Sequence, residues 1–145
     1  MTADASVSLS WVNTLLAASE RSGLARSTLL AHVGLPATQL DSARWPIDDI
    51  TRLWRGAAEL TQDPGFGLKA GSLVGPASFN VVSFILQSSP TLREALATTQ
   101  KFQRLISDGG RFQTVANTDT SWIIYHPQQG ELAFSPHQIE AVLAA

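Results

Sequence analysis

The chain has 145 residues, of which 44% are hydrophobic and only 15% are charged, and its formal net charge is −2 at pH 7. This length suits one domain spanning residues 1–145, and the 10 basic against 12 acidic residues give no surplus of Lys and Arg for phosphate binding. Because there are no cysteines, disulfides and thiolate metal sites are excluded. The low charge content predicts that a partner domain or a second subunit covers part of the surface.

Two short helices are predicted near the N-terminus. The first carries apolar residues on one face, with Ser10 as its expected N-cap, and it ends near residues 22–23. The second covers residues 25–33 and stops at Gly34. This helix–turn–helix spacing keeps direct DNA contact open as an alternative function, with Arg26 at the start of the second helix as the residue to test.

Two further helices are predicted in the next segment. Asp48 is the expected N-cap of the third, because a carboxylate is favoured at the positive end of a helix. Its apolar residues recur at spacings of three and four and predict a buried face: Ile50, Leu53, Trp54, Ala57 and Leu60. The fourth, residues 66–73, contains two glycines and is predicted to be a close-packed connector.

A pair of helices joined at Pro90 is predicted to form the centre of the fold. The first, from residue 78 to residue 87, is apolar almost all round, which predicts burial. The second covers residues 91–108, and Thr91 with Glu94 has the spacing of a capping box. The glycines that follow are available for a left-handed C-cap.

The hydrophobic period changes after residue 110. Alternation over residues 111–116 and 121–126, with turn residues between them, predicts a β-hairpin. Ser135-Pro136 then begins a last helix that reaches the end of the chain without a cap, so we expect the chain to be cut inside an element; docking of this helix on the core is the alternative. The predicted fold class is α+β, mainly α-helical with a C-terminal antiparallel β-hairpin.

The sequence contains no pattern typical of an enzyme. His32, His126 and His137 lie on different predicted elements at no metal-ligand spacing, and no serine lies in a nucleophile-elbow motif. The glycines near residue 67 do not form a phosphate loop. We therefore predict a protein that is not an enzyme and that needs neither a metal nor another cofactor. No apolar run is long enough to cross a bilayer.

An apolar ligand pocket is the remaining candidate site. Aromatic residues on the central helices and the hairpin provide its walls, and an arginine is suited to holding a carboxylate. From a wider group that also includes Phe79, the predicted ligand-binding residues are Phe84, Gln87, Phe102, Arg104, Trp122 and Tyr125. The alternative is that the aromatic residues form a solid core, in which case the chain would be a ligand-free dimerisation scaffold.

The central stretch resembles a known family. Residues 86–96, LQSSPTLREAL, followed by residues 102–109, FQRLISDG, resemble the N-terminal effector domain of AraC-type transcription regulators, in the arabinose-binding-like branch. Residues 46–47, residues 57–64 (AAELTQDP) and residues 67–71 (GLKAG) agree with the same pattern.

The resemblance covers nearly the whole chain from about Ser10 and implies a cytoplasmic, bacterial regulator. In such a protein the N-terminal part binds a small-molecule effector and forms a homodimer. A C-terminal helix-turn-helix domain, absent from this chain, contacts DNA. Family members continue past the last helix into more sheet before that domain. The family's name does not identify arabinose as the ligand, because the shared motif is structural and no residue pattern here selects a sugar.

Overall fold

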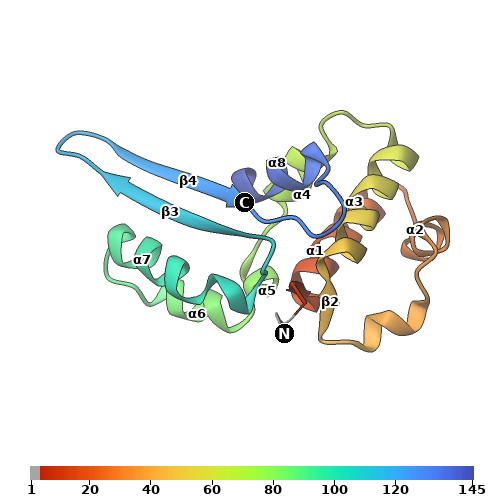
Figure 1. Cartoon of the computed structure of the whole chain (residues 1–145), viewed down its shortest axis with the longest axis horizontal. Coiled ribbons are helices and arrows are strands. Elements are labelled where there is room, and N and C mark those ends of the chain that lie inside the picture. Colours follow the sequence, from red (N-terminus) through yellow and green to blue (C-terminus); the bar gives the residue numbers. More distant parts are fainter. Residues whose placement is uncertain (1–3) are drawn as a thin grey trace.

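The computed structural model describes residues 4–145 and confirms an α+β fold with two small antiparallel sheets (Figure 1). In chain order the elements are β1 (Ser6–Ser8), α1 (Leu9–Arg21), α2 (Arg26–Val33), a 3₁₀ helix (Ala37–Asp41), β2 (Arg44–Pro46), α3 (Ile47–Thr61), α4 (Phe66–Ser72), α5 (Pro76–Phe79), α6 (Val81–Gln87), α7 (Leu92–Phe102), a 3₁₀ helix (Gln103–Leu105), β3 (Gly110–Ala116), β4 (Ser121–Pro127) and α8 (Pro136–Ala144). Within the described part of the chain, no helix is both long and apolar enough to span a bilayer.

The hydrophobic core lies in what we call the helical core region, which consists of β1, β2, α1–α4 and α8. Its largest fully buried side chains come from six different elements: Val7, Val12, Leu15, Leu16, Leu29, Trp45, Ile50, Leu53, Trp54 and Phe66. The predicted inward faces of α1, α2 and α3 are confirmed, except that Leu60 is 39% exposed. Burial of these apolar faces is the main stabilising contribution to the fold.

Two predicted N-caps are wrong. Ser8, not Ser10, caps α1, because its Oγ accepts a hydrogen bond from the backbone N–H of Trp11 at 3.4 Å. Asp48 makes no cap of α3, which begins at Ile47 directly after Pro46. Its carboxylate instead accepts hydrogen bonds from two backbone N–H groups of the distant 131–132 segment, at 3.2 and 3.0 Å. The sequence shows a carboxylate near a helix start but cannot show that a later loop supplies its donors.

The last helix, α8, docks on α4. At Gly67 an added Cβ would overlap the backbone of His137, and at Gly71 it would lie 2.5 Å from the carbonyl oxygen of Ala141. The Nδ1 atom of His137 also accepts a hydrogen bond from the backbone N–H of Gly67 at 3.1 Å. The two glycines therefore permit the close packing of α4 that the sequence predicted, and its partner is α8.

The prediction that the first of the two central helices is buried is wrong. We call α6, α7, β3 and β4 the hairpin region, and Figure 1 shows it extending to one side of the helical core region. Within α6 only Val82 and Ser83 are buried, whereas Phe84 is 73% exposed, and α7 has no buried residue. The reason is geometric: α6 packs on α7 and α7 packs on β3, so the other faces of these helices remain uncovered.

The helix boundaries in this region also differ from the prediction. The first helix is split into α5 and α6 at Asn80, whose φ of 52° interrupts the helical backbone. The second ends at Phe102 and tightens into a 3₁₀ turn, and neither Gly109 nor Gly110 has a positive φ, so the predicted left-handed C-cap is wrong. The predicted cap at the start of α7 is confirmed, since Thr91 Oγ1 accepts from the backbone N–H of Glu94 at 3.2 Å.

The β3–β4 hairpin is confirmed, with Gly110 paired to Pro127 and Ala116 paired to Ser121. Phe112 pairs with Tyr125 in this register. On the free edge of β3, the side chain of Gln103 accepts from the backbone N–H of Phe112 at 2.6 Å, and that of Gln100 donates to its carbonyl oxygen at 3.3 Å. These two glutamines fix the hairpin to the end of α7, which positions one face of the strands toward the helical core region.

Candidate functional site

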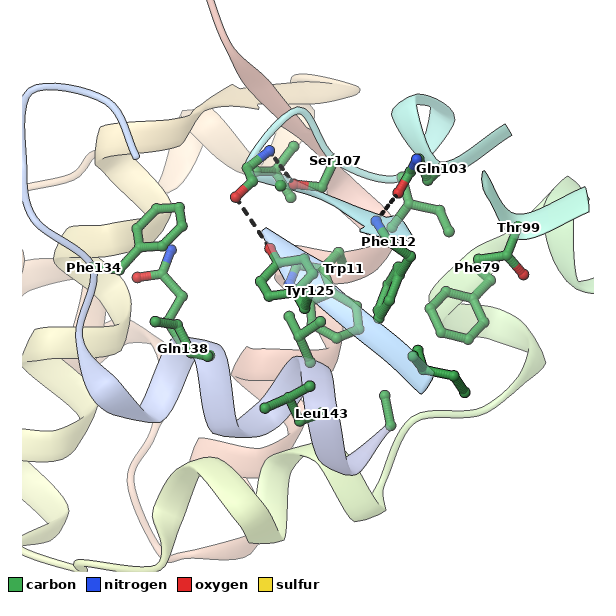
Figure 2. A pocket seen from close by; sticks show the side chains of 18 of the residues that line it. Trp11, Phe79, Thr99, Gln103, Ser107, Phe112, Tyr125, Phe134, Gln138 and Leu143 are labelled. Carbon is green, nitrogen blue, oxygen red and sulfur yellow. Dashed lines mark hydrogen bonds between the residues drawn. The ribbon is translucent and has the colours of Figure 1, made fainter. Parts of the chain in front are cut away.

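A cavity of about 440 Å³ lies between the helical core region and the hairpin region. Figure 2 shows side chains from α1, α5, α7, β3, β4 and α8 converging on it. Most of the lining is apolar or aromatic, and the labelled residues are Trp11, Phe79, Thr99, Gln103, Ser107, Phe112, Tyr125, Phe134, Gln138 and Leu143. This volume and this lining are typical of small-molecule pockets.

Two pairs of aromatic rings hold the cavity walls in place. Trp11 of α1 stacks on Phe79 of α5, with ring centroids 6.2 Å apart and planes 6° from parallel. Phe112 and Tyr125, which face each other across β3 and β4, have centroids 5.1 Å apart at 48°. Offset and tilted ring pairs of this kind add stabilisation beyond the burial of their area. The cavity therefore has one wall anchored in the core and a second anchored in the hairpin.

The polar groups at the cavity are few and largely occupied. The Tyr125 hydroxyl donates to the carbonyl oxygen of Gly109 at 3.1 Å, and Ser107 Oγ accepts from the backbone N–H of Gly109 at 2.8 Å (Figure 2). Burial raises the pKa of Tyr125 to about 12, because desolvation disfavours the phenolate. Tyr125 is therefore an uncharged group at neutral pH.

Gln138 is a buried polar side chain that lines the cavity from α8, beside Phe134 (Figure 2). Its Nε2 donates to Thr51 Oγ1 at 3.2 Å, while its Oε1 has no hydrogen-bond partner among the described residues. A buried acceptor without a partner is uncommon in folded proteins, because it loses its hydrogen bonds to water without replacement. The oxygen has almost no accessible surface, so it does not face the open space of the cavity.

At the rim of the cavity, Asp108 connects the hairpin region to β1. Its carboxylate accepts from the backbone N–H of Ser6 at 3.0 Å and from Arg104 Nε at 3.1 Å, and Arg44 Nη2 lies 3.5 Å away. Partial burial alone would raise the pKa of Asp108, but the hydrogen bond from Ser6, the hydrogen bond from Arg104 and the charges of both arginines outweigh it and lower the pKa. The carboxylate is therefore charged and firmly held at neutral pH.

The structure brings only one of the six predicted ligand-binding residues to the cavity, namely Tyr125. The other five lie outside it: Phe84 and Trp122 are 73% and 60% exposed, Gln87 is exposed, Arg104 pairs with Asp108 on the surface, and Phe102 lies under the ammonium of Lys101 at 5.3 Å. The alternation of strand side chains explains one of these differences. Trp122 and Tyr125 are three residues apart, so they project from opposite faces of β4.

The same alternation would have found a residue that the sequence interpretation missed. Phe112 pairs with Tyr125 across the hairpin, so it shares the cavity face of the strands. Phe79 belongs to the wider aromatic group considered from the sequence and does line the cavity. No sequence signal indicates Trp11 or Gln138, because they come from helices that are distant in the chain and meet the hairpin only in the folded protein.

The alternative sites gain no support from the geometry. Arg26, at the start of α2, forms an ion pair with Glu20, with 2.6 Å between its Nε and the Oε1 of Glu20. The hydrogen bond from Arg26 lowers the pKa of Glu20, and the pair leaves little free positive charge for a phosphate. In the part of the chain that the structure describes, no group of three His, Cys, Asp or Glu side chains could hold a metal ion.

Comparison with protein families decides the assignment. The model described as the arabinose-binding domain of AraC transcription regulators, N-terminal, matches residues 23–145. The chain belongs to this family. A search of curated protein sequences finds no match to it. As a member of the AraC-type N-terminal domains, the chain is a regulatory domain of a transcription regulator. The matched residues include the whole hairpin region and every cavity wall except those from β1 and α1.

Proposed function

We propose that this AraC-type domain binds a small-molecule effector in the cavity between the helical core region and the hairpin region. The observation that carries the proposal is the cavity itself, which has about 440 Å³ of space and walls contributed by both regions. Tyr125 is the residue from the sequence interpretation that we retain as a ligand contact. A molecule placed there would contact Trp11 and Phe79 on one side and Phe112 on the other.

We infer that the effector controls an attached DNA-binding domain by changing how the two regions sit against each other. A ligand shifts a conformational equilibrium only when it binds one arrangement better than another. The cavity meets this condition, because a molecule inside it adds apolar contacts to both walls at once. The α7 helix has no buried residue of its own, so these contacts would be a large addition to the packing of the hairpin region.

Homodimer formation, which the family resemblance implies, is also part of the proposal. The chain has large exposed apolar side chains on α6, at the start of α7 and on β4, and Phe84, Leu92 and Trp122 are 73%, 76% and 60% exposed. A second copy of the domain is the occupant that we propose for the exposed apolar side chains of α6 and α7. Analytical ultracentrifugation over a concentration series would test it, and a monomer at all concentrations would contradict it.

A matched pair of substitutions tests effector binding. Thr99 of α7 lines the cavity, whereas its neighbour Thr98 does not, and both are half-buried. Thr99→Phe should fill part of the space and abolish ligand-induced thermal stabilisation, while Thr98→Phe should leave it within about twofold of the wild type. Thermal shift followed by calorimetry would use amino acids, fatty acids, sugars, aromatic acids and alcohols. If no compound class stabilises the wild-type chain, the proposal is wrong.

A further inference from the structure

The cavity is notable for the absence of charged side chains among the described residues that line it. Among residues 4–145, none of the Asp, Glu, Lys, Arg or His side chains lines the cavity. Tyr125 is ionisable but carries no charge at neutral pH. Arg104, which the sequence interpretation assigned to a carboxylate, has an 84% exposed side chain and is paired with Asp108. Nothing inside the cavity can therefore neutralise a charged ligand.

Four hydroxyl groups line the cavity; those of Thr99 and Tyr125 can only accept hydrogen bonds, whereas those of Ser107 and Thr114 donate to no partner among the described residues. The hydroxyl hydrogens of Thr99 and Tyr125 are committed to the carbonyl oxygens of Ala95 and Gly109, at 3.0 and 3.1 Å, which leaves the lone pairs of both oxygens. A hydroxyl has one donor and two acceptor lone pairs, so the unused capacity at Thr99 and Tyr125 accepts hydrogen bonds, and a ligand hydroxyl can also accept one from Ser107 or Thr114.

From these two observations we propose that the cavity takes a neutral, mainly apolar molecule with a hydroxyl or N–H donor, such as an alcohol with a hydrocarbon chain or ring. This inference rests on the proposed function and names the chemical class of its effector. A carboxylate would lose its hydration without gaining a counter-charge, and it has no proton for the free acceptors. A zwitterionic amino acid would bring two charges into the same uncharged space.

A monosaccharide is disfavoured for a different reason. It carries several hydroxyl groups, and each one that loses water on binding needs a hydrogen-bond partner. The cavity offers few, because both amide atoms of Gln103 are already bonded, its Nε2 to the carbonyl of Gln100 and its Oε1 to the backbone N–H of Phe112. Apart from Thr99, Ser107, Thr114 and Gln138, the remaining lining residues are aromatic, aliphatic or glycine, which suits a hydrocarbon.

The test compares probes that share one chain length and differ in the polar group: n-octanol, octanoate and octyl methyl ether. Calorimetry on the 145-residue chain at neutral pH should show n-octanol binding at least about tenfold more tightly than octanoate. The ether, which has no donor, should bind about three- to tenfold more weakly than the alcohol. Octanoate affinity should rise as the pH falls toward the acid's own pKa, because the protonated acid is neutral and carries a donor.

Two controls locate the binding and remove a confounding charge. Tyr125 is the only tyrosine in the chain, so tyrosinate absorbance in a pH titration reports on the cavity alone. Saturating n-octanol should move its titration to higher pH, and Thr99→Phe should remove that shift. Because Ala145 also lines the cavity, the comparison is repeated on a chain extended by three Gly and Ser residues, which moves the terminal carboxylate away from the rim.

The outcomes separate this inference from the proposed function. If octanoate binds as tightly as n-octanol at neutral pH on both chains, or if a sugar or amino acid binds more tightly than either, the assigned ligand class is wrong while effector binding stands. If the ether matches the alcohol, the requirement for a donor is wrong. If no probe and no compound of the wider panel binds, both the inference and the proposed function fail.

Discussion

The helical core region and the hairpin region bury their apolar side chains in different ways. In the first, residues from six elements pack together, and Leu53, Trp54 and Phe66 are almost completely buried. In the second, α7 has no buried residue and α6 buries only Val82 and Ser83. One region thus has a core of its own, whereas the other relies on contacts with its neighbour.

This difference explains where the cavity lies. A close-packed core leaves few spaces larger than a water molecule, so a ligand site is not expected inside the helical core region. The hairpin region is fixed to the helical core region at only a few points, among them the Asp108 cluster. Elsewhere the cavity separates the hairpin region from the close-packed core, and a molecule bound there would give α7 packing contacts that the chain itself does not provide.

The largest expected effect comes from comparing two phenylalanines, one in each region. Phe66 is fully buried, edge-on to Trp54 with ring centroids 5.9 Å apart, whereas Phe84 is 73% exposed. Phe66→Ala should cost about 3–5 kcal/mol of unfolding free energy, a large share of a total of roughly 5–15 kcal/mol. Phe84→Ala in the isolated chain should stay within about 0.5 kcal/mol. Urea unfolding measures both, and equal losses would contradict the division into two regions.

A second, smaller effect is expected where α8 joins the core. Gly67→Ala should cost about 1–3 kcal/mol, because the new methyl group overlaps the backbone of His137 and outweighs the better helix propensity of alanine. The rate of backbone amide hydrogen exchange should increase in α8, the helix that contributes Gln138 to the cavity wall. Gly65→Ala is the matched control, since its nearest neighbour would lie at an ordinary 3.4 Å. Faster exchange in both variants would refute the contact between α4 and α8.

The third effect concerns the link at Asp108 and depends on pH. The pKa of this carboxyl is lowered from 3.8 in the folded chain, so its stabilising contribution is complete well above that pH and is lost as the pH falls through the folded value. Asp108→Asn should cost about 1–2 kcal/mol at pH 7, and the variant should converge with the wild type under strong acid. Asp119→Asn, in the exposed turn of the hairpin, should change stability by less than about 0.5 kcal/mol. If Asp108→Asn lowers the unfolding free energy by the same amount in strong acid, the ion pairs and hydrogen bonds of the Asp108 carboxylate are not the cause.

Much of the local structure could be predicted from the sequence. The helices of the helical core region follow from apolar residues at spacings of three and four, and Gly34 has the left-handed φ of 74° that a glycine stop requires. The hairpin follows from alternation and turn residues. The exposure of much of α6 could not be predicted, because an apolar helix indicates only that something covers it, and the described chain does not supply that cover.

Fewer residues of the candidate site could be predicted from the sequence. Tyr125 was identified because it is aromatic and lies on a strand beside other aromatic residues. Trp122 was grouped with it although strand alternation places the two on opposite faces. Trp11 and Gln138, from α1 and α8, contribute to the same cavity from positions more than a hundred residues apart in the chain. Only the packing of the helical core region brings them together.

By itself, the sequence determined the family, through its short motifs. It also determined the apolar faces of the helices and the alternation of the hairpin, because these depend on residues that are close in the chain and repeat with the period of a helix or strand. Only the tertiary structure decided that Asp48 binds the 131–132 backbone, that Gly67 receives α8, and that the cavity is free of charged side chains in the described chain. These contacts join distant segments, and which distant segments meet depends on how all the apolar surfaces pack at once.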